Sequence, residues 1–400
     1  MFDPKSVKAQ GPLAPYMDGF WSELMQRGYT TLSAEKLFGV ACQMSRWLKQ
    51  RRRGTRELTD ERVAQFTAHR RRQGYKEFIK PHAVEPFLSY LRKFGAAPPQ
   101  MAPSETPVDR FVREYTDHLA RERGLTAATI RGYGGFARRF ITGQPRANWL
   151  KWERLEPADI TGFVLREARR SCVGQAKQVV TELRSLLRYV RAKGLLERDL
   201  ASCVPAVAGW RLAGLPRGLE QDQIARVLGA CDDGSASGQR DGAIVRLLVR
   251  LGLRAGEVAA LTLEDLDWRT GEIVLRGKGR RESRLPLPRD VGRALVAYLR
   301  HGRPRTSDRR IFFCNNAPTR PLTSATLSAA VRLVLRRAGI PGGAHLLRHT
   351  AATQMLRHGA SLPEIGHVLR HRHLDTTAIY AKVDFAALRM VVRPWPGDAL

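Results

Sequence analysis

The sequence is poor in acidic residues and has no long hydrophobic run. Only 38 residues are Asp or Glu against 68 Lys and Arg, so the formal net charge is +30. A folded chain with this charge repels itself unless it meets a polyanion, and nucleic acid is the commonest such partner. The most apolar stretch, residues 243–253, is interrupted by Arg246 and Arg250 and is shorter than the ~20 residues of a membrane-spanning helix. The composition therefore favours a nucleic-acid-binding protein and excludes an α-helical membrane protein.

Cysteines are few, and their arrangement excludes a disulfide framework. The five cysteines are scattered, odd in number and form no C-x-x-C pair. This pattern is typical of reduced thiols in a cytoplasmic protein. The first fifteen residues contain no apolar signal core. Hydrophobic residues nevertheless make up 43% of the chain, enough for sizeable cores and too many for a disordered protein.

Two proline-rich stretches divide the chain, one at residues 96–107 and one at residues 204–218. Clustered prolines without periodicity indicate linkers. We expect an N-terminal helical module over 1–104, a second helical domain over 105–205, a linker over 206–217 and a third domain over 218–400. Helical spacing of apolar residues predicts three helices in the first segment, at 16–27, at 33–49 and from a cap at 58–61 through 69. The same spacing predicts four helices in the second segment, the last at 173–192.

The third segment mixes secondary-structure types. It predicts a helix over 241–251 and another from Ala255, then a hairpin of strands 272–276 and 283–287, then helices joined by short loops. The predicted fold class is therefore mainly α with a small antiparallel β-sheet (α+β).

Residues suited to phosphate chemistry occur in order along this segment. An arginine lies at a tight helix-to-helix junction, a lysine at a glycine-flanked hairpin tip, and a histidine and an arginine at i and i+3 on one helix. A tyrosine follows a further histidine by nine residues. Alone, each is more often a solvated, packing or solubilising side chain. These six residues are Arg254, Lys278, His345, Arg348, His371 and Tyr380.

Together, the six residues resemble the catalytic domain of the tyrosine recombinases, the phage-integrase and Xer-like family. Its pattern is an arginine in G-L-R-x-x-E, a hairpin lysine, H-x-x-R, and G-H-x-x-x-x-T-T-x-x-Y. The resemblance covers about residues 213–390, and the second segment resembles the family's helical core-binding domain. Arg370 departs from the pattern, since it stands where the family usually has glycine, and it adds a positive charge beside the site.

The resemblance implies a specific reaction. Tyr380 would attack a DNA phosphodiester, leaving a covalent 3′-phosphotyrosyl link and a free 5′-hydroxyl. Arg254 and Arg348 would hold the non-bridging oxygens as charge develops on them, and Lys278 would protonate the leaving 5′-oxygen. None of these steps demands a metal or cofactor.

The two histidines of the set take supporting roles in the same interpretation. His345 would assist as acid or base toward the tyrosine hydroxyl, and His371 would hydrogen-bond the phosphate. The neighbouring histidines are interpreted as capping, packing or DNA-contact residues, namely His349, His358, His367 and His373. Glu257 is interpreted as a structural support for the region around Arg254.

The resemblance also predicts an assembly on double-stranded DNA. The helical domains and the catalytic domain would form a C-shaped clamp, with Arg51, Arg52, Arg53 and Arg370 as candidate DNA contacts. Strand exchange requires four active sites, which predicts a homo-tetramer on DNA and a monomer or dimer off it. A C-terminal tail helix after Asp384 would dock either on a neighbouring protomer or on its own domain. The large N-terminal module favours a mobile-element integrase or transposase in the bacterial cytoplasm, associated with the nucleoid. Whether accessory proteins take part in the reaction stays open.

Three other interpretations remain at this point. His345 and His349 have metal-compatible i, i+4 spacing, but the glutamate of H-E-x-x-H is missing and no cysteine lies nearby. A metal-dependent nuclease or transposase would need clustered carboxylates, and the acidic residues after Asp290 are few and spread out. A DNA-binding regulator built on a recombinase fold would not need the six residues intact.

Overall fold

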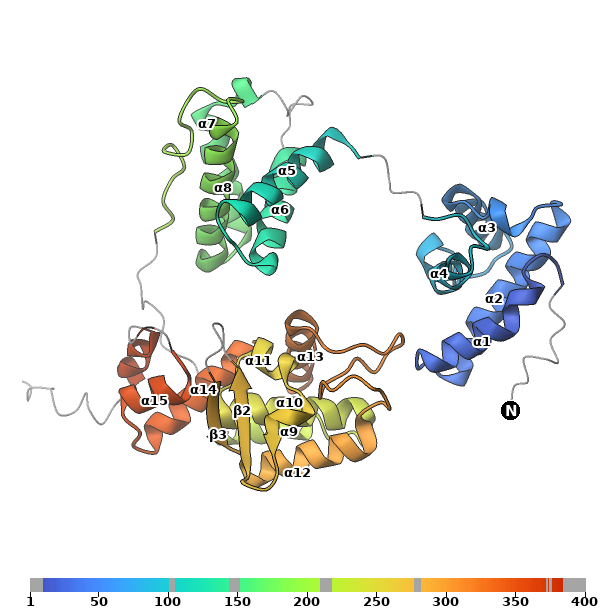
Figure 1. Cartoon of the computed structure of the whole chain (residues 1–400). Coiled ribbons are helices and arrows are strands. Elements are labelled where there is room, and N and C mark those ends of the chain that lie inside the picture. Colours follow the sequence, from blue (N-terminus) through green and yellow to red (C-terminus); the bar gives the residue numbers. More distant parts are fainter. Residues whose placement is uncertain are drawn as a thin grey trace, which may run out of the picture. The chain divides into compact units, whose positions relative to one another are not determined.

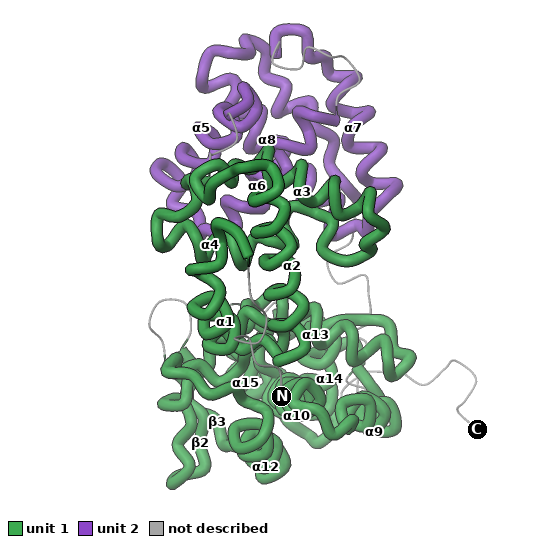
Figure 2. Tube along the Cα trace, turned by 90° about the vertical axis from the view of Figure 1, so that its right-hand side faces the viewer, with its two compact units in different colours: residues 1–100, 214–400 green, residues 101–213 purple. Residues whose placement is uncertain are grey.

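The computed structural model describes residues 10–100, 105–143, 152–208, 218–276, 282–371, 373 and 376–383. The chain divides into two compact units, one of residues 1–100 and 214–400 and the other of residues 101–213 (Figure 2). Buried hydrophobic residues form three large separate clusters, within 13–97, 108–204 and 219–347. Among the described residues, no helix is both long enough and apolar enough to span a membrane.

The N-terminal residues form a helical bundle around the first cluster. Threonine side chains at positions 30 and 59 accept hydrogen bonds from backbone N–H groups and so fix the starts of the second and third helices. The Phe20 and Phe87 rings lie 4.6 Å apart and join the first helix to the fourth. The four helices are α1 (Met17–Gln26), α2 (Thr31–Gln50), α3 (Asp60–Arg72) and α4 (Glu85–Lys93) (Figure 1).

The described part of the second unit is a bundle of four α-helices. Thr106 and Asp109 form a reciprocal capping box at its first helix, and the Thr126 side chain caps the second. The fully buried Tyr115 hydroxyl donates to Ser185 across 3.0 Å, which satisfies its polar group inside the core. The helices are α5 (Pro107–Arg121), α6 (Ala127–Thr142), α7 (Pro157–Arg170) and α8 (Val173–Ala192).

The third cluster surrounds α10, which packs against α12, α13 and α14. A three-stranded antiparallel sheet of order β1-β2-β3 follows α11, and the β2–β3 hairpin pairs Ile273 with Leu285. The helices are α9 (Gln221–Gly229), α10 (Ala236–Leu251), α11 (Ala255–Ala260), α12 (Arg289–Ala297), α13 (Ser324–Arg337), α14 (Ala344–Arg357) and α15 (Leu362–Val368). The strands are β1 (Leu266–Asp267), β2 (Glu272–Arg276) and β3 (Glu282–Pro286).

These elements confirm the predicted fold class, mainly helical with a small antiparallel sheet. The expected hairpin and the expected helix over 173–192 are present. The prediction of short loops after Arg289 is wrong between Gly302 and Ser324, where a long connection makes two isolated β-bridges, Thr262–Arg310 and Phe313–Pro321. These single pairings lack the period-two pattern by which a strand is recognised in a sequence.

Candidate active site

The first arginine of the predicted set lies where α10 passes into α11. Gly252 ends α10 with a φ of +60°, and a Cβ there would lie 2.4 Å from a Leu369 methyl carbon. Both its left-handed backbone and this close approach require glycine. Arg254 then begins α11, and its guanidinium donates to Glu257 Oε1 at 2.8 Å and to the Arg370 carbonyl at 3.2 Å. Its side chain is 45% exposed, so the guanidinium remains accessible to a ligand.

The second arginine, Arg348, is buried on α14. Its guanidinium donates to the Gly252 carbonyl and, at 2.6 Å, to the Leu369 carbonyl. Burial, followed by the charge of Arg254, lowers the pKa of Arg348 to about 10, so the side chain remains charged at pH 7. Leu369 and Arg370 therefore present consecutive carbonyls to the two arginines and bring them to one corner of the fold.

Arg370 adopts a left-handed backbone conformation, with a φ of +54°. Its guanidinium donates to Glu257 Oε2 at 2.7 Å, and both side chains are about 15% exposed or less. Glu257 thus connects two arginines. Burial raises the pKa of its carboxyl, but the Arg254 backbone N–H and the charge of Arg370 outweigh this and leave the pKa below its usual value. The structure thereby explains the departure from the family's glycine: the arginine keeps the glycine-like backbone and is held by an ion pair.

Arg370 substitutions separate the backbone strain from the ion pair. Arg370→Gly and Arg370→Ala both remove the ion pair with Glu257, but only glycine adopts the left-handed region without steric cost. We expect the glycine variant to be more stable than the alanine variant by about 1 kcal/mol, which corresponds to roughly 2–4 °C in unfolding midpoint for a domain of this size. Thermal unfolding followed by circular dichroism measures the difference. Equal midpoints for the two variants would contradict a strained backbone at this position.

The predicted nucleophile, Tyr380, lies in a 3₁₀ helix, Ala378–Val383, and is 2% exposed. It belongs to a small hydrophobic cluster with Ala352, Ile365 and Leu369. Burial raises the pKa of its hydroxyl to about 12 although the charge of Arg348 opposes the shift, so the phenol is protonated at pH 7. Its oxygen lies 2.7 Å from Nδ1 of His349.

The charge of Arg348 acts on both predicted histidines. The His345 ring stacks on the His349 ring, one turn further along α14, with 5.6 Å between centroids. Nδ1 of His371 lies 2.7 Å from the Thr377 hydroxyl oxygen. Burial, then Arg348 and Arg254, lowers the pKa of both histidines, that of His371 to about 4, and both are neutral at pH 7.

Lys278, which follows β2 in the sequence, lies outside the described residues. The other five predicted residues are within one network of hydrogen bonds, ring contacts and charge interactions. Across the described residues, no three His, Cys, Asp or Glu side chains form a group that could hold a metal ion.

The sequence analysis missed His349, which it interpreted as a capping, packing or DNA-contact residue. His349 makes the hydrogen bond with the Tyr380 hydroxyl that the predicted role of His345 requires. The signal in the sequence is the i, i+4 spacing of these two histidines, which places them on one face of α14. In a sequence alone, that spacing points first to metal binding.

The predicted DNA contacts Arg51, Arg52 and Arg53 are exposed at the end of α2, outside the Tyr380 network. The Arg51 guanidinium lies 4.5 Å from the centroid of the Trp47 ring, and Arg53 pairs with Glu57 at 2.5 Å. Arg370, the fourth candidate, instead directs its guanidinium to Glu257.

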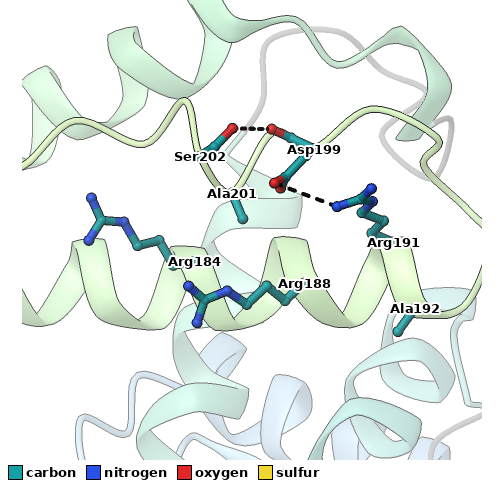
Figure 3. Close-up of a pocket in the computed structure, with 7 residues that line it drawn as sticks. All are labelled: Arg184, Arg188, Arg191, Ala192, Asp199, Ala201 and Ser202. Carbon is teal, nitrogen blue, oxygen red and sulfur yellow. Dashed lines mark hydrogen bonds and ion pairs between the residues drawn. The ribbon is translucent and has the colours of Figure 1, made fainter.

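A basic cavity that the sequence analysis did not identify lies along α8. It has a volume of about 610 Å³, and its lining includes Arg184, Arg188 and Arg191 (Figure 3). Arg184 donates to the Val204 carbonyl at 2.8 Å, and Arg191 lies 3.5 Å from Asp199. Arg188 is exposed and has no hydrogen bond or ion pair with any described residue.

The structure thus brings a buried tyrosine and two arginines to one corner of a helical domain. In a comparison with known proteins, the model of the phage integrase family matches residues 217–387. The chain is 40% identical over 397 residues to y4rA of Sinorhizobium fredii strain NGR234, which is provisionally named an integrase/recombinase; the match covers 98% of this chain and 96% of y4rA.

Two further proteins extend the comparison. The chain is 32% identical to the tyrosine recombinase XerD of Mycobacterium tuberculosis strain H37Rv, over 71% of this chain and 95% of XerD. Its fold is similar to that of the XerH site-specific recombinase in a post-cleavage complex with a palindromic difH substrate, with a TM-score of 0.54, 18% identity, and coverage of 82% of this chain and 93% of XerH. The chain belongs to the phage integrase family of tyrosine recombinases.

Proposed function

We propose that this chain breaks and rejoins double-stranded DNA at specific sites through a covalent 3′-phosphotyrosyl intermediate on Tyr380. The observation that carries the proposal is the meeting of Arg254, Arg348 and Tyr380 around the Leu369–Arg370 corner. Two guanidinium groups suit the two non-bridging oxygens of one phosphodiester, and a phenol suits in-line attack on its phosphorus.

Arg254 and Arg348 act by electrostatic stabilisation of the pentacoordinate transition state. In the DNA-free chain their N–H groups are engaged by Glu257 and by the carbonyls of Gly252, Leu369 and Arg370. Phosphate oxygens would take over some of these donors when DNA binds. The donors are therefore held near their working positions before DNA arrives, which reduces the reorganisation needed during reaction.

The remaining predicted residues complete the site. Lys278 protonates the leaving 5′-oxygen. Nδ1 of His371 is engaged by Thr377, which leaves Nε2 to donate to the phosphate. His345 stacks on His349, and burial followed by the charges of Arg348 and Arg254 lowers its pKa, so that it adds no positive charge beside the tyrosine at pH 7. Because the bond energy is retained in the tyrosyl phosphodiester, the 5′-hydroxyl of another strand can attack it and rejoin the DNA.

We assign the chain three working parts: an N-terminal module (1–104), a core-binding domain (105–205) and a catalytic domain (218–400). A linker (206–217) joins the core-binding domain to the catalytic domain. Positive charge for DNA phosphates is present on two of these parts. It comes from Arg51, Arg52 and Arg53 on the first part and from the basic cavity along α8, with Arg188, on the second. These surfaces support the proposal that the parts close around the duplex as a clamp.

Recombination requires two duplexes and hence four cleavage events, so the working assembly on DNA is a homo-tetramer. The predicted tail helix after Asp384, which would dock on a neighbouring protomer, lies outside the described residues. We further propose that the protein serves a mobile element in the bacterial cytoplasm, at the nucleoid. The preference for an integrase or transposase over other recombinases rests on the large N-terminal module.

Cleavage should proceed in EDTA, because arginines do the charge stabilisation for which other nucleases use divalent ions. The test is single-turnover cleavage of a nicked suicide substrate with and without chelator, and we expect equal rates. Loss of cleavage on chelation with binding intact would favour a metal-dependent nuclease instead.

Affinity for the same DNA site should fall steeply as the salt concentration rises. Six to ten phosphate contacts would lower the affinity by a factor of about 10³–10⁵ between 50 and 200 mM salt.

A further inference from the structure

The hydroxyl of the proposed nucleophile has a defined partner in His349. The Tyr380 oxygen and Nδ1 of His349 are 2.7 Å apart, and the two rings meet at 60° with 5.7 Å between centroids. His349 lies on α14, directly after Arg348, whereas Tyr380 lies in the 3₁₀ helix that packs against α14. A rigid helix therefore presents the imidazole nitrogen to the reacting oxygen.

The surroundings of Tyr380 leave Nδ1 of His349 as the acceptor for the proton of the tyrosine hydroxyl. The ring is enclosed by Ala352, Ile365 and Leu369, and the side chain is 2% exposed. Because burial raises the pKa of the phenol to about 12, attack on phosphorus at neutral pH requires removal of the proton during the reaction. Among the described residues, the hydroxyl makes its hydrogen bond to His349.

The electrostatic surroundings keep His349 able to accept a proton. The charged and titratable groups that act on it are His345 and Arg348 on α14, Tyr380, and His371 after α15. Burial, then His345 and Arg348, lowers the pKa of His349, so the imidazole is neutral at pH 7. In the tautomer with its proton on Nε2, Nδ1 accepts the hydrogen bond from the phenol.

The other two histidines are placed differently. The His345 ring contacts His349 rather than Tyr380, and Nδ1 of His371 is paired with the Thr377 hydroxyl. The carboxylate of Glu257 is engaged by Arg254 and Arg370. The proton-accepting role toward the tyrosine is therefore open, and the geometry gives it to His349.

We propose that His349 is a catalytic residue that orients the Tyr380 hydroxyl and accepts its proton as the phenol attacks DNA. This inference rests on the function proposed above. The proton moves from the Tyr380 oxygen to Nδ1, the Tyr380 oxygen forms a bond to phosphorus, and the P–O5′ bond breaks. The departing 5′-oxygen takes a separate proton from Lys278. In rejoining, the 5′-hydroxyl returns a proton to Lys278 and His349 returns one to Tyr380, so the cycle is balanced.

His349→Asn tests the proton transfer directly, since its amide oxygen accepts a hydrogen bond near the position of Nδ1 but cannot take up a proton at pH 7. We expect single-turnover cleavage of a suicide substrate to slow by about 10²-fold or more, with affinity for the DNA site within about twofold of the parent. His349→Gln is the second variant, for the case in which asparagine disturbs folding. The matched control is His358→Asn, at the exposed end of the same helix, which should cleave at the parental rate.

A DNA substrate with sulfur in place of the bridging 5′-oxygen distinguishes the two proton transfers. A thiolate leaves without protonation, so this substrate should restore cleavage to Lys278→Ala but not to His349→Asn. The parental rate should also fall at acid pH, below the ordinary range of a histidine pKa, where His349 takes up a solvent proton, and His349→Asn should lose that component.

Three results would overturn the assignment: a parental cleavage rate in folded His349→Asn, a faster rate, or rescue of this variant by the sulfur substrate. The first denies His349 a role, the second makes it a restraint on Tyr380, and the third moves its action to the leaving group. Each of these results requires covalent complexes with the parental protein. Failure of the parental protein to form any such complex would instead contradict the proposed function itself.

Discussion

Tyr380→Phe should abolish covalent attachment to DNA while leaving DNA binding within a few-fold of the parent. The substitution removes the one oxygen that forms the bond to phosphorus, so we expect a loss of cleavage of roughly 10⁴-fold or more. The phenyl ring still fills the cluster with Ala352, Ile365 and Leu369. The lost hydrogen bond to His349 should cost about 1 kcal/mol of folding stability. Denaturing gels of suicide-substrate reactions measure attachment, and mobility shifts measure binding.

Tyr298→Phe is the matched control. Tyr298 is also fully buried, and its hydroxyl accepts a hydrogen bond from the Phe313 backbone N–H at 3.2 Å. The control therefore removes a buried tyrosine hydroxyl from the same domain, and it should retain cleavage. Trapping that persists in Tyr380→Phe and disappears in Tyr298→Phe would show that the nucleophile is misassigned. A DNA-binding regulator would lose nothing in either variant.

Arg348→Ala should slow cleavage by about 10²–10³-fold with a much smaller effect on binding, because the guanidinium gains most as charge develops on the phosphate oxygens. Arg348 also holds the carbonyls of Gly252 and Leu369, so its loss affects the fold as well as the reaction. Arg254→Ala provides the same test at a side chain that is 45% exposed, where truncation leaves the core intact. Single-turnover rates on saturating enzyme measure the chemical step for both variants.

The triple substitution of Arg51, Arg52 and Arg53 by glutamine should have the opposite effect, on DNA binding rather than on the cleavage rate. These exposed residues lie outside the Tyr380 network, so we expect weaker DNA binding and an unchanged single-turnover rate. The slope of log affinity against log salt should become shallower by about one unit for each of these arginines that pairs with a phosphate. Similar behaviour of the two groups of arginines would contradict their division into catalytic and DNA-holding residues.

Local patterns predicted most of the helices, because helix starts depend on residues close in sequence. Thr30, Thr59 and Thr126 cap the helices that follow them, and apolar residues at helical spacing define the buried faces. The β2–β3 hairpin was equally predictable. The two-residue strand β1 was missed because it is too brief to establish a period. The helices α4 and α9 were also not predicted.

The sequence predicted the residue types that gather at this corner of the fold, but not their contacts. Order along the chain identified Arg254, Arg348 and Tyr380, since the resemblance consists of that order. The hydrogen bond between His349 and Tyr380 joins residues 31 positions apart, and the pair of Glu257 and Arg370 joins residues 113 positions apart. Such contacts depend on how α11, α14 and the segment after α15 pack, which no local pattern specifies.

The most direct test of the central claim is to identify the atom of the protein that carries the DNA. The parental protein would be trapped on a nicked suicide substrate in EDTA, digested, and the DNA-linked peptide sequenced by mass spectrometry. The account predicts a nucleotide attached through its 3′-phosphate to Tyr380, with a free 5′-hydroxyl on the released strand. Attachment to another residue, a 5′-phosphate linkage, or cleavage without any covalent peptide would contradict it.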